Sequence, residues 1–252
     1  MKRRFYKMKV TYDHTLFDTI PGLCVGILAI RAIDNRGVNL EAEAFRRRCC
    51  TEANLLLKMN PAMADGEIKR YDDALTHLHM KGTTAISALF REYKKELGIE
   101  EEEEAKAEED YEILSQPKAA SLDELAGSDV LPRTNPLMDM VRGGMLKFHV
   151  DIHAFDMGDR KTPLTVHQKD GEWVVSLGDE TAVHHWYCEE GSAAKVDENS
   201  ENILILITGF APNRKKVAAA RNELARRMKS AFDRSVEVGW LEDGTHEFTA
   251  SI

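Results

Sequence analysis

Cysteine is scarce in this chain of 252 residues, and its arrangement excludes the common cysteine-based sites. The four copies are Cys24, Cys49, Cys50 and Cys188. None forms a CxxC pair, and the two adjacent cysteines cannot easily bridge to each other or serve one metal ion. We therefore expect four reduced thiols in a cytoplasmic protein.

Long apolar runs are also missing. No window approaches about 18 uninterrupted apolar residues, so no membrane span is expected. The basic start at residues 1–10 is followed by Asp13, His14 and Asp18 in place of an apolar stretch, so no signal peptide is expected either. The chain contains neither GxGxxG nor GxxxxGKS/T, which excludes the usual signatures of nucleotide-binding folds.

An excess of positive charge is missing as well, because 34 Lys and Arg residues face 43 Asp and Glu residues and the net charge is −9. That balance weighs against non-specific nucleic-acid binding, which depends on neutralising phosphates. A local basic patch is still compatible with it. The helix predicted at residues 213–234 carries the candidates for contact with tRNA phosphates, unless its charges are simply solvated. The acidic run EEEEEAKAEED at residues 100–110 predicts a solvated, mobile insertion over about 100–118, or a partner-binding segment.

The residues that are present predict one α+β domain over 1–252, with mixed sheets and flanking helices. The apolar runs LCVGILAIRAI (23–33) and NILILIT (202–208) are typical of buried central strands. Helical periodicity covers residues 40–59, 68–97 with a break near Gly82, and 213–236. Shorter strands are expected at residues 7–11, 164–168, 172–177 and 184–188. Ser121 with Glu124 predicts a capping box, and Asn135-Pro136 predicts a helix that ends near Gly143-Gly144.

The most informative stretch is TNPLMDMVRGGMLKFHVDIHAFD, residues 134–156. From Lys147 onward polar and apolar residues alternate, which predicts a strand with two distinct faces. His149, Asp151 and His153 are then expected on one face, as the wall of a pocket. Metal ligands and solvated strand residues are the alternatives, but alternate positions on one strand seldom supply a complete metal site. We therefore predict no metal site.

Several segments occur in an order that suggests a family. They are Pro21-Gly-Leu-Cys-Val-Gly-Ile-Leu, Arg91-Glu-Tyr with Leu97-Gly98, Ser121-Leu-Asp-Glu-Leu, Leu131-Pro-Arg-Thr-Asn135 with Asp139, His153-Ala-Phe-Asp156, Gly178, Trp186, Lys195-Val196 and Glu201-Asn-Ile-Leu. Together they resemble the B3/B4 domain of the phenylalanyl-tRNA synthetase β chain, and more closely its free-standing single-domain relatives. The resemblance covers residues 21–224, nearly the whole chain.

In the synthetase this domain forms an editing pocket that hydrolyses mischarged aminoacyl-tRNA. The resemblance implies a B3/B4 fold, a substrate that joins an amino acid to tRNA by an ester, and attack by water without a cofactor. It places His153 as the pocket histidine, and Asp151 on the same strand face could orient it. The remaining candidates, for substrate binding, are Asn135, Asp139, His149, Asp156, Trp186 and Thr208.

The chain departs from the family pattern at two places. The family has a glutamate in the late central strand, where Leu206 or Thr208 stands here, and a second Asn where Arg142 stands. Thr208 could accept a hydrogen bond from a substrate, but it is not a base. A non-catalytic module that binds tRNA or an amino acid is therefore an alternative, as is an interaction protein that keeps only the fold. Asn135 and Asp139 have structural alternatives as a helix cap and a hydrogen-bond acceptor.

Overall fold

A computed structural model of the chain describes residues 7–80, 82–99, 131–183, 186 and 194–250. The acidic run at 100–110, the capping box at Ser121 and most of the strand predicted at 184–188 lie outside these residues. The described elements form an α+β arrangement of two mostly antiparallel sheets with flanking helices, which confirms the predicted fold class at that level.

The first sheet has the strand order β6-β5-β4-β1-β9. Its strands are β1 (Lys9–Tyr12), β4 (Leu164–Lys169), β5 (Glu172–Leu177), β6 (Glu180–Val183) and β9 (Glu247–Thr249). Strand β1 pairs in parallel with β4 and antiparallel with β9, so it is held on both sides. The remaining pairs are antiparallel hairpins.

The second sheet has the order β3-β7-β2-β8, and all its pairs are antiparallel. Its strands are β2 (Cys24–Ile30), β3 (Asp151–Asp156), β7 (Ile203–Gly209) and β8 (Val236–Leu241). Every residue of β2 and β7 is buried, because the first sheet covers one face of this sheet and helices cover the other. This confirms that the two apolar runs are central strands.

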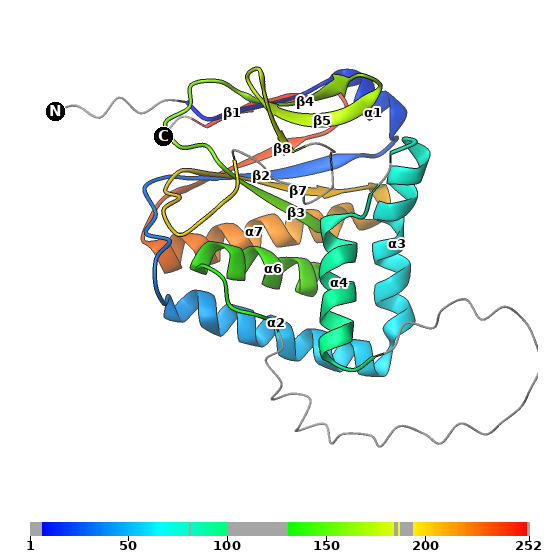
Figure 1. The fold of residues 1–252 in the computed structure, drawn as a ribbon, viewed down its shortest axis with the longest axis vertical. Helices are drawn as coiled ribbons and strands as arrows, with labels where there is room; N and C mark the ends of the chain where they lie inside the picture. Colours follow the sequence, from blue (N-terminus) through cyan, green and yellow to red (C-terminus); the bar gives the residue numbers. More distant parts are fainter. Residues whose placement is uncertain (1–6, 81, 100–130, 184–185, 187–193, 251–252) are drawn as a thin grey trace, which may run out of the picture.

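The helices lie mainly on one side of the second sheet (Figure 1). They are α1 (His14–Thr19), α2 (Leu40–Met59), α3 (Pro61–His77), α4 (Ala85–Glu96), α6 (Pro136–Phe148) and α7 (Arg214–Phe232), with a short 3₁₀ turn, η1 (Ala211–Asn213), before α7. Helices α6 and α7 pack against the sheet, α2 packs beneath them, and α3 and α4 stand at one end. None of the described helices is both long enough and apolar enough to cross a lipid bilayer.

The break predicted near Gly82 is confirmed, since α3 ends at His77 and α4 begins at Ala85. Three helix boundaries differ from the sequence prediction. Helix α3 begins at Pro61 and not at residue 68, because proline is tolerated in the first turn. The helix predicted to continue to residue 236 ends at Phe232, and Val236 already begins β8. Helix α6 does not end at Gly143-Gly144 but continues to Phe148. A Cβ at Gly144 would lie 3.2 Å from side-chain carbons of Ile152 and Leu224, so this glycine permits close packing and does not end the helix.

Candidate functional site

A small cavity lies between the two sheets. Its empty volume is about 240 Å³ including the open mouth, with room at its centre for about one water molecule. It is lined by Tyr12 and Val175 of the first sheet, His153, Phe155, Leu206 and Thr208 of the second, and Trp186. Most of this lining is apolar, and the polar groups converge from both sheets, as in many ligand-binding pockets.

The register of the second sheet explains which side chains reach this cavity. Asp151 pairs with Thr208 across strands β3 and β7, and His153 pairs with Leu206. Alternate residues of a strand share a face, so the side chains of both cross-strand pairs point toward the first sheet. Leu206 and Thr208, the two candidate positions for the glutamate, therefore both face the cavity, and neither side chain is acidic. The carboxylate of Asp151 lies opposite Thr208 on the neighbouring strand.

His153 lines the cavity and is hydrogen-bonded to Asp151, which is not itself part of the lining. The Asp151 side chain is fully buried, and its Oδ2 lies 2.8 Å from His153 Nε2. Its Oδ1 accepts a hydrogen bond from the backbone N–H of Ile86, at 3.0 Å. Ile86 lies in the first turn of α4, where unpaired N–H groups and the helix dipole favour a negative charge. The helix end thus holds Asp151, and Asp151 fixes the orientation of the imidazole.

This contact also decides which imidazole nitrogen can act as a base. A carboxylate only accepts hydrogen bonds, so His153 donates through Nε2–H, and the neutral ring carries its lone pair on Nδ1. The side chain of His153 is 14% exposed and lines the cavity, so it is accessible to a small molecule there. The prediction that Asp151 and His153 lie together on one strand face is confirmed.

Tyr12 contributes a hydroxyl group from the opposite sheet, which the sequence analysis did not single out. Its side chain is buried, and burial raises the pKa of its hydroxyl, against the smaller effects of Trp186 and Thr208. Among the described residues, no group makes a hydrogen bond of normal geometry with Tyr12 Oη. No local pattern distinguishes Tyr12, because only the pairing of β1 with β4 and β9 brings it to the cavity.

Trp186 and Thr208, two of the predicted binding residues, both line the cavity. Trp186 is buried, packs edge-on against the Tyr12 ring at 6.2 Å and donates its backbone N–H to the carbonyl of Trp173. It is therefore both a core residue and a wall of the cavity. Thr208 is buried with its side chain in the lining, and its carbonyl accepts a hydrogen bond from the Tyr71 hydroxyl at 2.9 Å.

His149 does not lie on the strand face, so the predicted strand starting at Lys147 is wrong at its beginning. The residue caps the C-terminus of α6 with φ of 52°, a left-handed conformation that turns its side chain away from β3. Its ring contacts the Glu67 carboxylate through Nδ1 and packs edge-on against Phe90. Burial lowers the pKa of His149, and Glu67 opposes this shift only in part.

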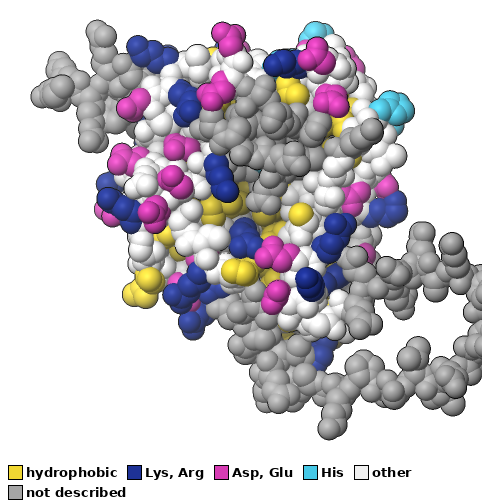
Figure 2. Space-filling view, viewed as in Figure 1, with side chains coloured by type: hydrophobic (Ala, Val, Ile, Leu, Met, Phe, Trp, Pro, Cys, Tyr) yellow, Lys and Arg dark blue, Asp and Glu magenta, His cyan; other side chains and the backbone are white. Residues whose placement is uncertain are grey.

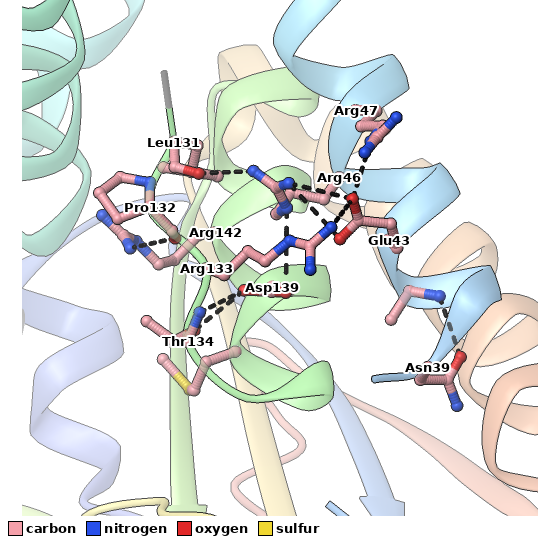
Figure 3. Close-up of polar contacts among 12 residues, drawn as sticks. Asn39, Glu43, Arg46, Arg47, Leu131, Pro132, Arg133, Thr134, Asp139 and Arg142 are labelled. Atoms are coloured by element: carbon pink, nitrogen blue, oxygen red, sulfur yellow. Dashed lines mark hydrogen bonds and ion pairs between the residues drawn. The ribbon is translucent and has the colours of Figure 1, made fainter. Parts of the chain in front are cut away.

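Three other predicted site residues have structural partners outside the described lining of the cavity. Asn135 caps α6 by accepting the backbone N–H of Met138. Asp139 accepts two hydrogen bonds from Thr134 and lies 3.8 Å from the buried Arg46, between α6 and α2 (Figure 3). Asp156 ends β3 and accepts hydrogen bonds from the Gly158 backbone and the Ser200 hydroxyl. These contacts agree with the structural alternatives for Asn135 and Asp139.

The basic side chains of α7 are largely paired within the protein. Ion pairs join Arg214 to Glu242, Lys216 to Glu67, and both Arg226 and Arg227 to Glu223. On the face seen in Figure 2, Lys and Arg side chains are interspersed with Asp and Glu. Phosphates would have to compete with these carboxylates, so the helix is a weaker candidate for tRNA contact than its sequence indicates.

Metal-binding and cysteine-based chemistry find no support in the described part of the chain. No three His, Cys, Asp or Glu side chains gather there as metal ligands. Cys24, Cys49 and Cys50 are buried thiols without a disulfide. Burial raises the pKa of Cys24 to about 11 and that of Cys49 to about 12, so neither is a thiolate at neutral pH.

Comparison with known proteins adds no family assignment, since no protein-family model and no curated protein matches this chain. The resemblance to the B3/B4 domain therefore stays a prediction. The geometry establishes a cavity between two sheets that brings together a carboxylate-held imidazole, a threonine hydroxyl and a tyrosine hydroxyl. Within the described ranges, that tyrosine hydroxyl has no hydrogen bond of normal geometry.

Proposed function

We propose that this chain is a free-standing relative of the B3/B4 editing domain that hydrolyses an aminoacyl ester of tRNA in trans. The observation that carries the proposal is His153 in the wall of an otherwise largely apolar cavity, hydrogen-bonded to the buried Asp151. A histidine with a fixed tautomer and access to a small cavity is the arrangement that general-base catalysis of water attack requires.

In the proposed reaction, a water molecule in the cavity attacks the ester carbonyl while His153 Nδ1 takes its proton. The bond between the carbonyl carbon and the ribose oxygen then breaks, and the imidazolium returns the proton to the departing ribose hydroxyl. The products are a free amino acid and an uncharged tRNA. The Asp151 carboxylate stabilises the imidazolium through its 2.8 Å contact with Nε2.

The size of the cavity bears on the substrate. In this conformation it has room at its centre for about one water molecule, so only a small part of an aminoacyl group fits without movement. This favours either a small amino acid or a ligand that separates the sheets on binding. Deacylation of a panel of aminoacyl-tRNAs that differ in the size of the amino acid separates these two cases.

A non-catalytic module that binds tRNA or an amino acid is the second candidate. It is favoured by Leu206 and Thr208, since both face the cavity and neither replaces the acid of the family. A binding module needs the apolar walls and hydroxyl groups of the cavity but no base. The largely compensated charge of α7 weighs against tRNA as its ligand and leaves a free amino acid.

The test is deacylation of a panel of mischarged aminoacyl-tRNAs by the wild type, His153→Ala and a control, His77→Ala. His77 is exposed at the end of α3, so its replacement should leave turnover unchanged. We expect hydrolysis of at least one panel member and a loss of about 100-fold or more in His153→Ala. Undiminished turnover in His153→Ala would exclude the proposed mechanism.

The same proteins also test the binding alternative. No hydrolysis across the panel, together with thermal stabilisation by a free amino acid, would identify a binding module, since a true ligand stabilises by RT ln(1 + [L]/Kd). Neither hydrolysis nor stabilisation would indicate an interaction protein that keeps only the fold.

A further inference from the structure

We propose that Tyr12 is a substrate-contacting residue, whose hydroxyl donates a hydrogen bond to the carbonyl oxygen of the bound aminoacyl group. The inference rests on the proposed function for the identity of that group. It adds a residue from the opposite sheet to the site, so that the two sheets hold the reacting carbonyl between them.

The first argument is the burial of the Tyr12 hydroxyl, whose contacts with Trp186 and Thr208 lack the geometry of a normal hydrogen bond. The residue is 1% exposed, and among the described residues no group makes a hydrogen bond of normal geometry with its Oη. Buried polar side-chain atoms nearly always have a partner in folded proteins, so each exception needs an explanation. Here the unpaired atom belongs to a residue that lines a cavity, where a ligand can supply the missing acceptor.

The second argument is that Tyr12 is held rigidly. Strand β1 is paired on both sides, and the Tyr12 backbone N–H donates to the His246 carbonyl at 2.8 Å. Its ring contacts Phe17 at 6.0 Å and Trp186 at 6.2 Å between centroids. A donor that cannot turn away loses little entropy when a ligand arrives, and such preorganisation is what stabilises charge developing in a transition state.

The third argument concerns the protonation state of the hydroxyl. Burial raises the pKa of Tyr12, and the charge of Asp151 acts in the same direction. The phenol therefore stays neutral throughout the physiological range and keeps its proton for donation. A neutral donor suits a carbonyl oxygen that becomes negative when water adds, whereas a phenolate would repel it.

The chain offers a matched control in Tyr71. Its side chain is as buried as that of Tyr12, but its hydroxyl donates to the carbonyl of Thr208 at 2.9 Å and accepts from Asn213 Nδ2 at 2.8 Å. Removing the Tyr71 hydroxyl breaks two structural hydrogen bonds, whereas removing that of Tyr12 loses only its contacts with Trp186 and Thr208, which lack normal hydrogen-bond geometry. The two Tyr→Phe variants therefore separate a structural hydroxyl from one kept for a ligand.

The first measurement is the melting temperature of Tyr12→Phe and Tyr71→Phe without ligand. We expect Tyr12→Phe to melt at the wild-type temperature or above it, because the variant no longer buries an unsatisfied hydroxyl. Tyr71→Phe should melt several degrees lower, because it leaves the Thr208 carbonyl and Asn213 without that partner. A decrease in Tyr12→Phe as large as that in Tyr71→Phe would show a structural hydroxyl and overturn the inference.

The second measurement separates the contact from the reaction. The probes are 3′-aminoacylamino-3′-deoxyadenosines, which keep the carbonyl oxygen but resist hydrolysis, used beside the aminoacyl-tRNA panel. We expect Tyr12→Phe to lower kcat on the accepted panel member by about 100-fold, as for loss of one oxyanion donor, and to raise KM by a smaller factor because the bound carbonyl also loses a hydrogen bond. It should also lose thermal stabilisation by the matching amide.

The outcomes distinguish the two proposals. Hydrolysis that is unchanged in Tyr12→Phe overturns the role of Tyr12 and leaves the proposed function intact. If an amide stabilises the wild type but not Tyr12→Phe, and no ester is hydrolysed, the result supports the contact with Tyr12 and excludes the proposed hydrolysis. If no panel member is hydrolysed and no amide stabilises the wild type, both proposals fail.

Discussion

Replacing Asp151 with Asn tests the tautomer on which the proposed chemistry depends. The substitution keeps the shape of the side chain, so its oxygen can still accept the Ile86 backbone N–H that now lies 3.0 Å from Oδ1. The amide nitrogen would then face His153 Nε2, 2.8 Å from the present carboxylate oxygen. Because that nitrogen donates, the imidazole must accept through Nε2 and carry its proton on Nδ1. Nδ1, the nitrogen assigned as the base, then carries the proton and cannot accept another from water.

The expected change in stability is small. Two charge-assisted hydrogen bonds become neutral ones, which costs about 1–3 kcal/mol in total. Removing a fully buried charge relieves a desolvation penalty of similar or larger size, so the net change should stay within about 2 kcal/mol. Activity should change far more, because loss of a general base typically lowers rates by about 10²- to 10⁴-fold.

Three assays on Asp151→Asn check this reasoning. Urea unfolding gives the change in stability, single-turnover deacylation gives the rate, and ¹⁵N chemical shifts of the imidazole report which nitrogen carries the proton. Asp156→Asn is the control, since that carboxylate is on the same strand but bonds Gly158 and Ser200 away from the cavity lining. Deacylation within threefold of wild type, or an imidazole that keeps its proton on Nε2, would refute the argument.

Two further predictions concern stability. Burial lowers the pKa of His149 below its ordinary 6.5, so the unfolded chain takes up the proton first as the pH falls below that value. The free energy of unfolding, measured with urea, should therefore fall by up to about 1.4 kcal/mol per pH unit there, and His149→Asn should flatten this dependence. A slope that persists in the variant would assign it to other groups. Gly209→Ala should lower the free energy of unfolding by about 1–3 kcal/mol, because the new Cβ would lie 2.4 Å from a Val217 methyl. Gly66→Ala should raise it by about 0.5–1 kcal/mol, because no atom lies near the new Cβ and alanine favours the helix α3.

The elements that the sequence predicts well are those whose signals are local. The apolar runs of β2 and β7 and the periodicity of α2 need only neighbouring residues to be recognised, and α2 has the predicted bounds of Leu40–Met59. Asn135 likewise caps α6 as its type and position indicate. Asp151 and His153 follow from the alternation of a strand, which is again a local pattern.

The features that the sequence does not reveal depend on contacts between distant segments. Gly144 sits within a helix because Ile152 and Leu224 pack against it, a reason that no window around residue 144 contains. The wrong position predicted for His149 has the same cause, since the additional turn of α6 makes this residue a helix cap instead of a strand residue. Strand β8 was not predicted because its first residue falls within the helix predicted at 213–236, and because it contains Gly239 and is only half-buried along most of its length. Tyr12 reaches the site only through the pairing of β1.

The position of β1 between β4 and β9 has a consequence for synthesis on the ribosome. Lys9 pairs with Thr249, and Val10 pairs with Phe248, so the strand that carries Tyr12 lacks one of its neighbours until almost the whole described chain has been translated. Such long-range pairing is slow to form and leaves an unpaired strand edge exposed in the meantime. The second sheet also needs β8 for completion, but its β3–β7–β2 part can assemble earlier. The wall with the imidazole should therefore form first, and the nascent protein should acquire its cavity only as translation reaches β9.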